Sequence, residues 1–479
     1  MKMCLPVLKK CLPVFLGASL LAATPVVHAD DDDAVKVGKK VADYMMATWP
    51  KLDDPTCTTN CFSLNYATVP PGPSLKYWEY TNGVPMYGIW KMYEETGDIR
   101  YYNYVKSWID GLVDADGKIS YTFGGTATRD PRIQDTMQPA TLLFGLYKKT
   151  GDARYLKAMQ NMRAVFNTMQ VNPQGAWWHK PTYPNQQWLD STYMSLPFLA
   201  QYGALYANQT SPGDSTVALN MVTQQIKLMS QFTLNPTKSL YYHAWNGQAD
   251  GVWGGLKTPP AVGDISSPVL WSRSIAWYYI GVIDVLDSLP KNHADRAALI
   301  QIVKNISSGL KKYQDKKTGL WNQVIDVTND KLPANGGYRT EQVAALPNWN
   351  ETSASALFVY GLSKAARKGY VNDDYRDIAK KGWKGVKTKI LISGNAVTIK
   401  GTVVGMSVGG TYNSYVNADF RTDLTTGPVP APAATCNPPA VPLYTSAPTE
   451  CKFIYVRDNV PQGFGAVLIA AAEMAQSDD

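Results

Sequence analysis

The chain has 479 residues, of which 45% are hydrophobic and 18% charged. This composition provides for a large apolar core and excludes a disordered, tail-like protein. The length fits two to four average domains or one large closed barrel. Tyrosine (29) and tryptophan (14) outnumber phenylalanine (11), which favours contact with polar, ring-shaped ligands because their flat faces carry a hydrogen-bonding edge. Only four histidines are present, which argues against a multi-histidine metal cage.

The first 29 residues have the pattern of a signal peptide. Three lysines precede the apolar run 12–23, and Val27-His28-Ala29 fits the small-residue cleavage site. Its removal takes away no acid and lowers the formal charge from +7 to +4. This weak charge, without a basic block, argues against nucleic-acid binding. No later stretch has the length of a membrane span. We therefore expect a soluble protein, secreted or periplasmic, with no membrane or nucleic-acid partner.

Cysteine usage agrees with an oxidising compartment. Two of the six cysteines fall in the predicted signal peptide, and Cys57, Cys61, Cys436 and Cys451 remain. An even number suggests two disulfides, for which three pairings are possible. We favour Cys57–Cys61 and Cys436–Cys451 because each pair brackets a loop-like segment rich in proline and threonine. A zinc site is the alternative, although no histidine lies near either pair.

Helical periodicity recurs along the rest of the chain, whereas strand-like alternation is scarce. The predicted helices lie near residues 34–48, 82–96, 98–113, 136–150, 152–170, 188–207, 215–233, 269–288, 292–314, 350–368, 372–387 and 461–476. The helices near 353–362 and 463–474 are rich in apolar and small residues and are expected to be inner helices. The segments 50–75 and 400–455 interrupt the succession of helices and are expected to form long loops or short strands on one face of the helical ring.

A turn motif repeats between successive helices. Thr96-Gly97-Asp98 recurs 54 residues later as Thr150-Gly151-Asp152, and a looser copy begins at Gly369. We expect the glycine to end one helix in the left-handed conformation and the aspartate to cap the next helix. Twelve helices make six hairpins, and hairpins that repeat at this spacing can close into a ring. The sequence therefore predicts one all-α domain over residues 30–479.

The densest cluster of chemically useful side chains lies between residues 177 and 190. His179 and Lys180 follow two tryptophans, and Trp188-Leu189 leads into Asp190. Asp190 fits a plain helix N-cap. The aromatic residues, histidine and lysine crowded before it indicate instead a carboxylate whose pKa is easily raised, as a general acid requires. Both interpretations stay open on the residues alone.

Two further candidates begin other helices. Asp135 starts the equivalent helix one hairpin earlier and could also be a cap, but in a ring the starts of inner helices converge on one mouth. Two carboxylates there would raise each other's pKa. Arg273, between Trp271 and Trp277, is a charged side chain at the start of a buried helix and requires an anion. His243 adds a second histidine in aromatic company.

Together these motifs resemble glycoside hydrolase family 105, the unsaturated rhamnogalacturonyl hydrolases, which are related to the unsaturated glucuronyl hydrolases. The resemblance runs through most of the chain after residue 29, and each motif alone is weak. It depends on the order and spacing of the segments around residues 135, 179–194, 242–245, 271–277, 351–356 and 463–474.

The resemblance implies an (α/α)6 barrel, which matches the six predicted hairpins, and no metal or organic cofactor. It implies a hydrolase that removes the non-reducing 4,5-unsaturated uronic acid from oligosaccharides left by polysaccharide lyases, of rhamnogalacturonan type first of all. The family's general acid/base matches Asp190, and Asp135 matches the residue that assists it. The residues implied to line the sugar site are His179, Lys180, His243, Trp271, Arg273 and Trp277.

Two other functions remain open. An inverting glycosidase on the same barrel would use Asp135 and Asp190 as acid and base on saturated glycans that contain uronic acid. A secreted sugar-binding protein without catalytic activity would keep the tryptophans and Arg273 but would not depend on Asp190. The leaving sugar, rhamnose or another, is not fixed by the sequence.

Overall fold

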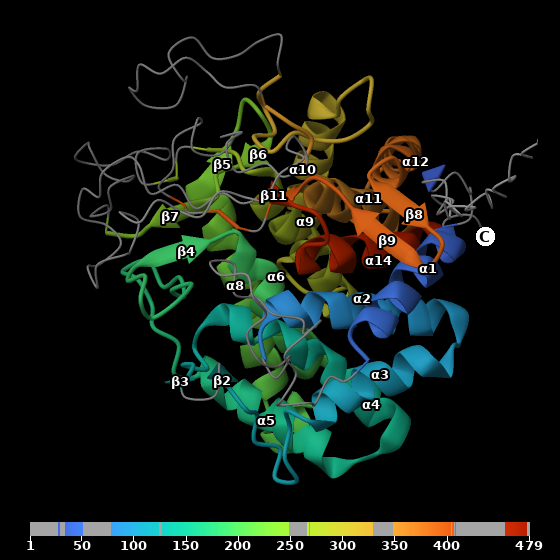
Figure 1. Cartoon of the computed structure of the whole chain (residues 1–479). Coiled ribbons are helices and arrows are strands. Elements are labelled where there is room, and N and C mark those ends of the chain that lie inside the picture. Colours follow the sequence, from blue (N-terminus) through green and yellow to red (C-terminus); the bar gives the residue numbers. More distant parts are fainter. Residues whose placement is uncertain are drawn as a thin grey trace, which may run out of the picture.

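The computed structural model describes residues 27–28, 34–50, 78–123, 127–248, 266–267, 269–328, 348–403, 405–406, 408 and 456–476. Helices make up most of these residues (Figure 1). The four cysteines of the predicted disulfides, the segment 51–75 and most of 400–455 lie outside them. The disulfide pairs therefore stay predictions.

Six helices form a closed inner ring. Around the ring they are α2 (Tyr80–Thr96), α4 (Thr141–Thr150), α6 (Asp190–Leu205), α9 (Ser272–Ser288), α11 (Thr352–Arg367) and α14 (Pro461–Gln476). The α4 position includes two 3₁₀ turns, η1 (Gln134–Thr136) and η2 (Gln138–Ala140), which bridge α2 and α6. The last helix, α14, packs on the first, α2, and closes the ring (Figure 1).

Six outer helices alternate with the inner ones along the chain. They are α1 (Ala34–Thr48), α3 (Ile99–Asp110), α5 (Ala153–Phe166), α8 (Asp214–Thr233), α10 (Arg296–Tyr313) and α12 (Asp374–Lys387), and a single turn, α7 (Ala207–Thr210), precedes α8. All twelve predicted helices are thus confirmed, with ends displaced by a few residues. The helix predicted over 136–150 begins later, at Thr141, because Pro139 sits in the first turn of η2 and the chain enters α4 through 3₁₀ turns.

The burial of the helices separates the two layers. In α11 every residue from Thr352 to Ala366 is buried, and in α14 every residue from Gln462 to Met474. A helix that is buried on all sides lies in the interior of a domain. The outer α10 instead buries one stripe, which includes Leu299, Ile302 and Val303. The prediction that the segments near 353–362 and 463–474 are inner helices is confirmed.

The repeated turn motif has the predicted geometry. Gly97 and Gly151 adopt φ values of 69° and 67°, in the left-handed region that glycine enters without strain. Asp98 Oδ1 accepts a hydrogen bond from the backbone N–H of Arg100 at 3.0 Å, and Asp152 makes the same bond with Arg154. These caps fix the angle between one hairpin and the next.

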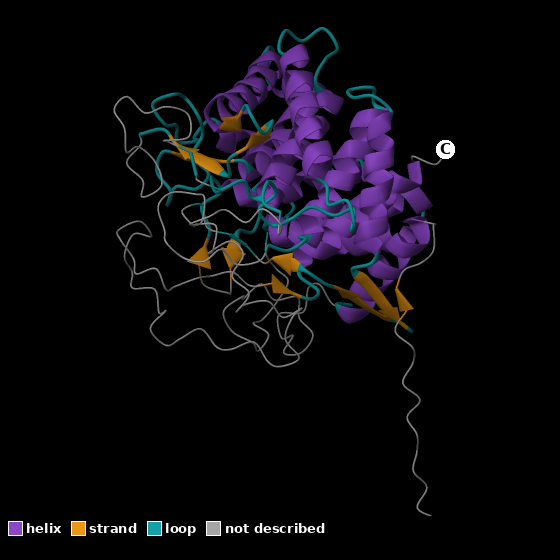
Figure 2. Ribbon diagram, turned by 90° about the horizontal axis from the view of Figure 1, so that it is seen from above, coloured by secondary structure: helices purple, strands orange, loops and turns teal. Residues whose placement is uncertain are grey.

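Short strands connect the loops outside the helical body (Figure 2). Antiparallel pairs join β2 (Thr122–Phe123) to β3 (Ala127–Thr128), β4 (Gln186–Trp188) to β7 (Ala244–Asn246), β5 (Leu234–Asn235) to β6 (Leu240–Tyr241) and β10 (Thr402–Val403) to β11 (Val456–Arg457). A third strand, β1 (Val27–His28), pairs with the hairpin of β8 (Ile390–Ser393) and β9 (Ala396–Ile399). β1 lies in the predicted signal peptide, whose removal would leave the β8–β9 hairpin with its own four residue pairs.

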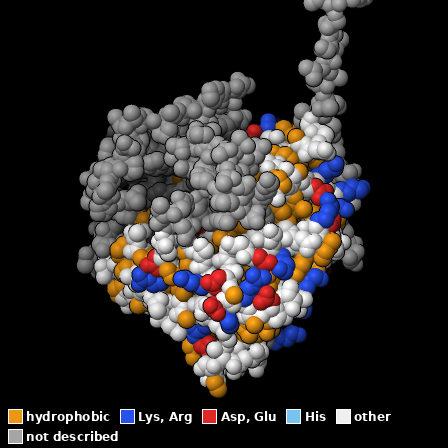
Figure 3. Space-filling model, turned by 60° about the horizontal axis from the view of Figure 1, so that its bottom comes forward, with side chains coloured by type: hydrophobic (Ala, Val, Ile, Leu, Met, Phe, Trp, Pro, Cys, Tyr) orange, Lys and Arg blue, Asp and Glu red, His pale blue; other side chains and the backbone are white. Residues whose placement is uncertain are grey.

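The surface of the described part carries mixed charges. On the face in Figure 3, lysine and arginine side chains alternate with aspartate and glutamate. Among the described residues, no helix combines the length and the apolar character needed to cross a membrane.

The close packing of α14 against α2 predicts that a side chain at Gly465 would destabilise the protein. A Cβ on Gly465 would lie 2.6 Å from Val84 Cγ1 and 2.8 Å from the backbone N of Pro85. Backbone atoms cannot rotate away, so we expect Gly465→Ala to lower the free energy of unfolding by about 1–3 kcal/mol, measured by thermal or urea unfolding. Gly111→Ala is the control, since its Cβ would meet only ordinary contacts at 3.6 Å. Equal stability of the two variants would contradict a tight seam.

Candidate active site

One strand pair brings two distant loops together. β4 pairs with β7 so that Trp188 lies opposite Ala244. One residue beyond β4, the backbone N–H of Leu189 donates to the carbonyl of His243 at 2.9 Å. Asp190 follows Leu189, so its side chain meets the imidazole of His243. Strand pairing therefore sets the position of both groups.

The loops before the inner helices bind each other in the same way around the ring. We call this set of backbone hydrogen bonds the collar. It consists of Gln134 N to His179 O (3.2 Å), Leu189 N to His243 O (2.9 Å), Ser272 N to Gln323 O (3.0 Å), Gln323 N to Trp349 O (2.8 Å) and Thr352 N to Gly401 O (2.9 Å). The predicted convergence of inner-helix starts on one mouth is therefore found in the structure.

Asp135 is held by two side chains of the neighbouring loop, a lysine and a histidine. It is 4% exposed, with Oδ2 2.7 Å from Lys180 Nζ and Oδ1 3.7 Å from His179 Nε2. Burial alone would raise the pKa of this carboxyl, but Lys180 and His179 outweigh it and hold the pKa below its usual value. Asp135 is therefore ionised at neutral pH. It lies inside a 3₁₀ turn whose N-cap is Ile133, so the interpretation as a helix cap is wrong.

Asp190 has a different neighbour. Its Oδ2 lies 3.3 Å from His243 Nε2, and its side chain is 14% exposed, while His243 is fully buried. Asp190 is the first residue of α6, whose N-cap is Leu189 and has no side-chain cap. The plain N-cap interpretation is therefore wrong here too. The two carboxylates therefore lie in different surroundings, one bound by a lysine and the other facing an imidazole.

The Trp188 indole links the two histidines. The ring of His179 stacks on it at 4.3 Å and that of Tyr183 at 5.1 Å, while His243 meets it edge-on at 5.4 Å. His179 also shares a hydrogen bond of 2.8 Å with the hydroxyl of Ser191 through Nδ1. Burial lowers the pKa of His179 to about 4, so its ring is neutral at pH 7.

The anion that lies next to Arg273 is a carboxylate of the protein itself. Its guanidinium is 1% exposed and lies 4.0 Å from the Glu351 carboxylate, and it donates to the carbonyl of Val403. Glu351 also accepts from the backbone N–H groups of Ala354 (2.5 Å) and Val403 (3.0 Å). The sequence rightly required an anion here, but the anion that the structure provides is Glu351. The role of Arg273 in binding a substrate carboxylate stays a prediction.

The two predicted tryptophans of α9 lie in different places. Trp271 is in the collar, where it contacts the ring of His243 at 4.7 Å and donates to Gln323 Oε1 at 3.0 Å. Trp277 lies six residues further along and stacks on Tyr193 at 5.0 Å within the hydrophobic core. The structure thus brings together every predicted site residue except Trp277, which packs between α6 and α9.

Two residues beside Asp135 were missed. Glu79, the N-cap of α2, is buried and forms an ion pair with Arg129, which follows β3. Burial and the Asp135 charge raise the pKa of Glu79, and Arg129 opposes this rise. The available signal was the position of Glu79 shortly before the predicted helix 82–96, which is comparable to the position of Glu351 directly before α11.

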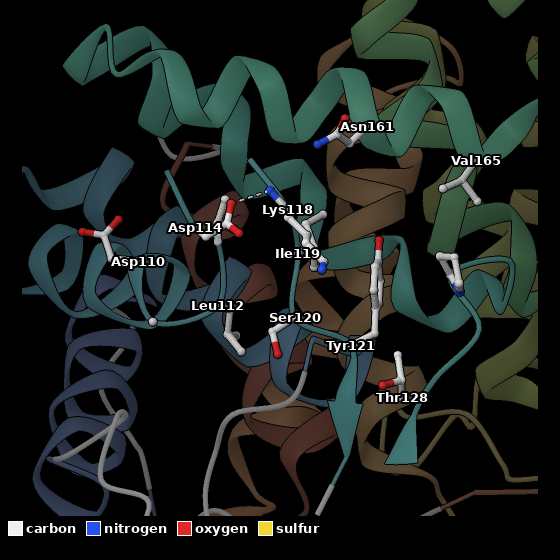
Figure 4. A pocket seen from close by; sticks show the side chains of 13 residues that line it. Asp110, Leu112, Asp114, Lys118, Ile119, Ser120, Tyr121, Thr128, Asn161 and Val165 are labelled. Atoms are coloured by element: carbon white, nitrogen blue, oxygen red, sulfur yellow. Dashed lines mark hydrogen bonds between the residues drawn. The ribbon is translucent and has the colours of Figure 1, made fainter. Parts of the chain in front are cut away.

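A surface groove of about 680 Å³ lies elsewhere, between α3 and α5 (Figure 4). Tyr121, Lys118 and Asn161 are among its lining residues, which include none of the predicted site residues. Its two carboxylates serve the protein itself, since Asp110 binds Arg154 and Asp114 accepts from the backbone of Lys118. The carboxylate pairs at the collar, rather than this groove, locate the candidate site.

Among the described residues, no cluster of three or more His, Cys, Asp and Glu could hold a metal ion.

The closed ring of paired helices is an (α/α)6 barrel, and its collar gathers carboxylates, imidazoles and aromatic rings at one end, as a sugar-processing site requires. Residues 57–428 match the sequence model of Glycosyl Hydrolase Family 88, and the chain belongs to this family. The predicted resemblance is confirmed at this level.

Solved structures agree with the fold. The family 105 glycoside hydrolase of C. acetobutylicum ATCC 824 has a TM-score of 0.67 and 25% identity, over 92% of this chain and 99% of that chain. A possible family 105 member from Klebsiella pneumoniae has a TM-score of 0.65 and 21% identity, over 99% and 100%.

Curated relatives match a smaller part of the chain. The unsaturated rhamnogalacturonyl hydrolase YesR of Bacillus subtilis is 24% identical over 255 residues, which are 52% of this chain and 64% of YesR. An unsaturated 3S-rhamnoglycuronyl hydrolase of Alteromonas sp. is 24% identical over 28% of this chain and 29% of its own length. The chain thus spans less than two thirds of these relatives.

The depressed pKa of His179 predicts an acid-sensitive fold. The unfolded chain binds the proton more readily, because the ordinary pKa is 6.5 and the folded one about 4. His179 therefore contributes stability that is complete above pH 6.5 and is lost as the pH falls toward 4. Thermal unfolding should show a smaller loss between these pH values in His179→Gln than in the parent. His293→Gln, a half-buried histidine in the turn between α9 and α10, serves as control. An identical loss in all three proteins would contradict the neutral, buried ring.

The Arg273–Glu351 pair predicts a stability effect. Arg273→Met leaves Glu351 buried without its cation, and we expect a loss of about 3–5 kcal/mol in the free energy of unfolding. Adding Glu351→Gln should recover part of that loss. A folded Arg273→Met protein of parental stability with only a raised KM would instead assign Arg273 to substrate binding.

Proposed function

We propose that the protein is an unsaturated uronyl hydrolase, which removes a non-reducing 4,5-unsaturated uronic acid from oligosaccharides that polysaccharide lyases produce. The observation that carries the proposal is the pair Asp135 and Asp190, which lie in η1 and at the first position of α6 and each face a histidine. Family membership and the similarity to YesR, an unsaturated rhamnogalacturonyl hydrolase, support it.

The reaction needs one group that first donates and then accepts a proton. The substrate carries a vinyl ether across C4, C5 and the ring oxygen. Protonation at C4 by the Asp190 carboxyl gives an oxocarbenium-like cation at C5. Water adds to C5 and returns a proton to the Asp190 carboxylate. The resulting hemiketal opens by cleavage of the bond between C5 and the ring oxygen, and C1, now a hemiacetal, releases the neighbouring sugar as an alcohol.

The surroundings of the two carboxylates support a division of roles between them. Lys180 keeps Asp135 ionised, so Asp135 is poorly suited to deliver a proton and well suited to stabilise positive charge as it develops. Asp190 faces the His243 imidazole at 3.3 Å and is partly open to solvent, so it can exchange protons with water. Asp190 is therefore assigned as general acid/base, with Asp135 assisting it.

The substrate carboxylate calls for a cation with access to solvent. Lys180 meets this need, since its side chain is 24% exposed, whereas that of Arg273 is 1% exposed and engaged with Glu351. Tyr183 and Trp188 lie within 6.0 Å of the Lys180 amino group and offer flat faces for sugar rings. We assign carboxylate recognition chiefly to Lys180.

The proposal also covers the sugar that the reaction releases and the compartment in which the protein acts. Rhamnogalacturonan-type oligosaccharides are the first substrates to test, because the relatives named above are an unsaturated rhamnogalacturonyl hydrolase and an unsaturated 3S-rhamnoglycuronyl hydrolase. The signal-peptide pattern of residues 1–29 supports secretion to the periplasm or the medium. N-terminal sequencing of the exported protein would locate the cleavage site.

Asp190→Asn should reduce turnover about 10³-fold or more, because the amide cannot deliver the proton, while the unfolding temperature stays near that of the parent. The assay follows the ultraviolet absorbance of the C4–C5 double bond, which disappears on hydration. Asp374→Asn is the matched control, an exposed aspartate at the start of the outer helix α12.

Two outcomes would reverse the assignment. Cleavage of saturated uronides at equal or higher rates, with the unsaturated substrate left intact, would indicate an inverting glycosidase. Undiminished activity of Asp190→Asn would remove Asp190 from the chemistry, and sugar binding without turnover by the parent would indicate a binding protein.

A further inference from the structure

The outer helix α8 supports the strand pair of the candidate site through Gln225. This side chain is 3% exposed. Its Oε1 accepts a hydrogen bond from the backbone N–H of Trp177 at 2.9 Å and another from Gln187 Nε2 at 3.0 Å. Its Nε2 donates to the carbonyl of Gly175 at 3.0 Å. These bonds use three of the four positions at which a glutamine amide can form hydrogen bonds.

Gln187 extends this connection to the second strand. It lies in β4, directly opposite Trp245 of β7, and is 3% exposed. Its Oε1 accepts from the indole Nε1–H of Trp245 at 3.1 Å. The Trp245 ring is fully buried and stacks at 4.2 Å on Phe232, another residue of α8. We call Gln225, Gln187 and Trp245 the polar relay, which joins α8 to both strands.

The polar relay lies behind the candidate site. Neighbouring side chains of a strand point to opposite faces. Trp188 stacks on the ring of His179, whereas Gln187, one residue earlier, binds the side chain of α8. The relay therefore acts on the site residues through the backbone that carries them.

Each segment that the polar relay binds carries a candidate site residue a few positions away. These pairs are Trp177 with His179, Gln187 with Asp190 and Trp245 with His243. Because Gln225 Oε1 accepts from both Trp177 and Gln187, this one atom fixes the loop before β4 relative to the strand that leads to Asp190. Lys180 lies in that loop, and Asp190 begins α6. The relay thus sets the spacing between Lys180 and Asp190.

The polar character of Gln225 distinguishes the relay from ordinary packing. Buried neighbours on the same helix, Val222, Ile226 and Met229, are apolar. A buried amide costs free energy unless its hydrogen bonds are made, and here they are made to the backbone of a loop. An apolar residue would fill the same volume but would leave that loop free to shift against β4.

We propose that Gln225 and Gln187 are positioning residues for the hydration reaction. The inference rests on the proposed function. In that reaction Lys180 binds the substrate carboxylate, which is attached to C5, and Asp190 protonates the adjacent C4. A substrate held by Lys180 therefore presents C4 to Asp190 only if the loop and the start of α6 keep their spacing, and the polar relay keeps it.

Gln225→Met tests the relay, because methionine has a similar volume but lacks the amide. We expect kcat for the unsaturated substrate to fall roughly 10- to 100-fold with little change in KM, since the substrate still binds Lys180 but its C4 is displaced from Asp190. Gln225→Glu keeps both accepted bonds and loses the one to Gly175, so its kcat should lie between those of Gln225→Met and the parent.

A double-variant cycle tests whether the two glutamines act together. Gln187→Met should also lower kcat, and Gln225→Met/Gln187→Met should fall only slightly below the weaker single variant, because both substitutions break the same hydrogen bond. Trp245→Phe keeps the stack on Phe232, removes only the indole N–H and should lower kcat several-fold.

Gln314→Met is the matched control for a loss of stability. The Gln314 amide, at the end of α10, donates to the carbonyls of Gly319 at 2.8 Å and Ile378 at 3.0 Å, so its removal should also lower the unfolding temperature. Neither carbonyl belongs to the collar. The kcat and KM of this variant, measured well below its unfolding temperature, should match those of the parent.

The outcomes separate the two proposals. A parent protein that leaves the double bond of every unsaturated oligosaccharide intact overturns the proposed function and, with it, the role of the relay. An active parent whose Gln225→Met variant loses stability but keeps the parental kcat overturns the relay alone. So do a raised KM with unchanged kcat, losses that multiply independently in the double variant, and an equal loss of kcat in Gln314→Met. Should Gln225→Met fail to fold, Gln225→Glu and Trp245→Phe carry the same test.

Discussion

The site depends on the hydrogen-bonded collar that joins the loops in front of the inner helices. A helix N-terminus leaves its first N–H groups without partners inside the helix, and here neighbouring loops satisfy several of them. The bond from Leu189 to His243 and that from Gln134 to His179 each hold a candidate acid next to a histidine from another loop. A ring of helices would otherwise hold its loops loosely at the mouth.

The collar also explains why so many charges can be buried there. An isolated carboxylate away from water would be protonated, so each one needs a cation in a fixed place. Asp135 has Lys180, Glu79 has Arg129 and Glu351 has Arg273. The last of these pairs joins α9 to α11 and lies in the protein interior, whereas the first keeps one partner partly open to solvent. Similar ion pairs therefore lie in the protein interior at one point and at the candidate site at another.

Local patterns in the sequence predicted the helices well, because helix periodicity, glycine ends and aspartate caps act over a few residues. Asp190 and Asp135 were identified by their crowded surroundings, and the need of Arg273 for an anion followed from its burial. Its partner could not be predicted, since Glu351 lies 78 positions away in sequence and meets it only when the ring closes. The same holds for Glu79 and Arg129, whose approach depends on the β2–β3 hairpin.

The surplus of tyrosine and tryptophan over phenylalanine has a second explanation in the packing of the two layers. Trp321 donates from its indole to the Leu310 carbonyl at 2.9 Å, and the Tyr278 hydroxyl donates to the Ile226 carbonyl at 3.0 Å. Both rings are fully buried. Phenylalanine would fill the same space but leave each of these carbonyls without that donor. The composition therefore reflects the helical ring first, and only a few of these rings, Trp188 and Tyr183 among them, lie beside the candidate site.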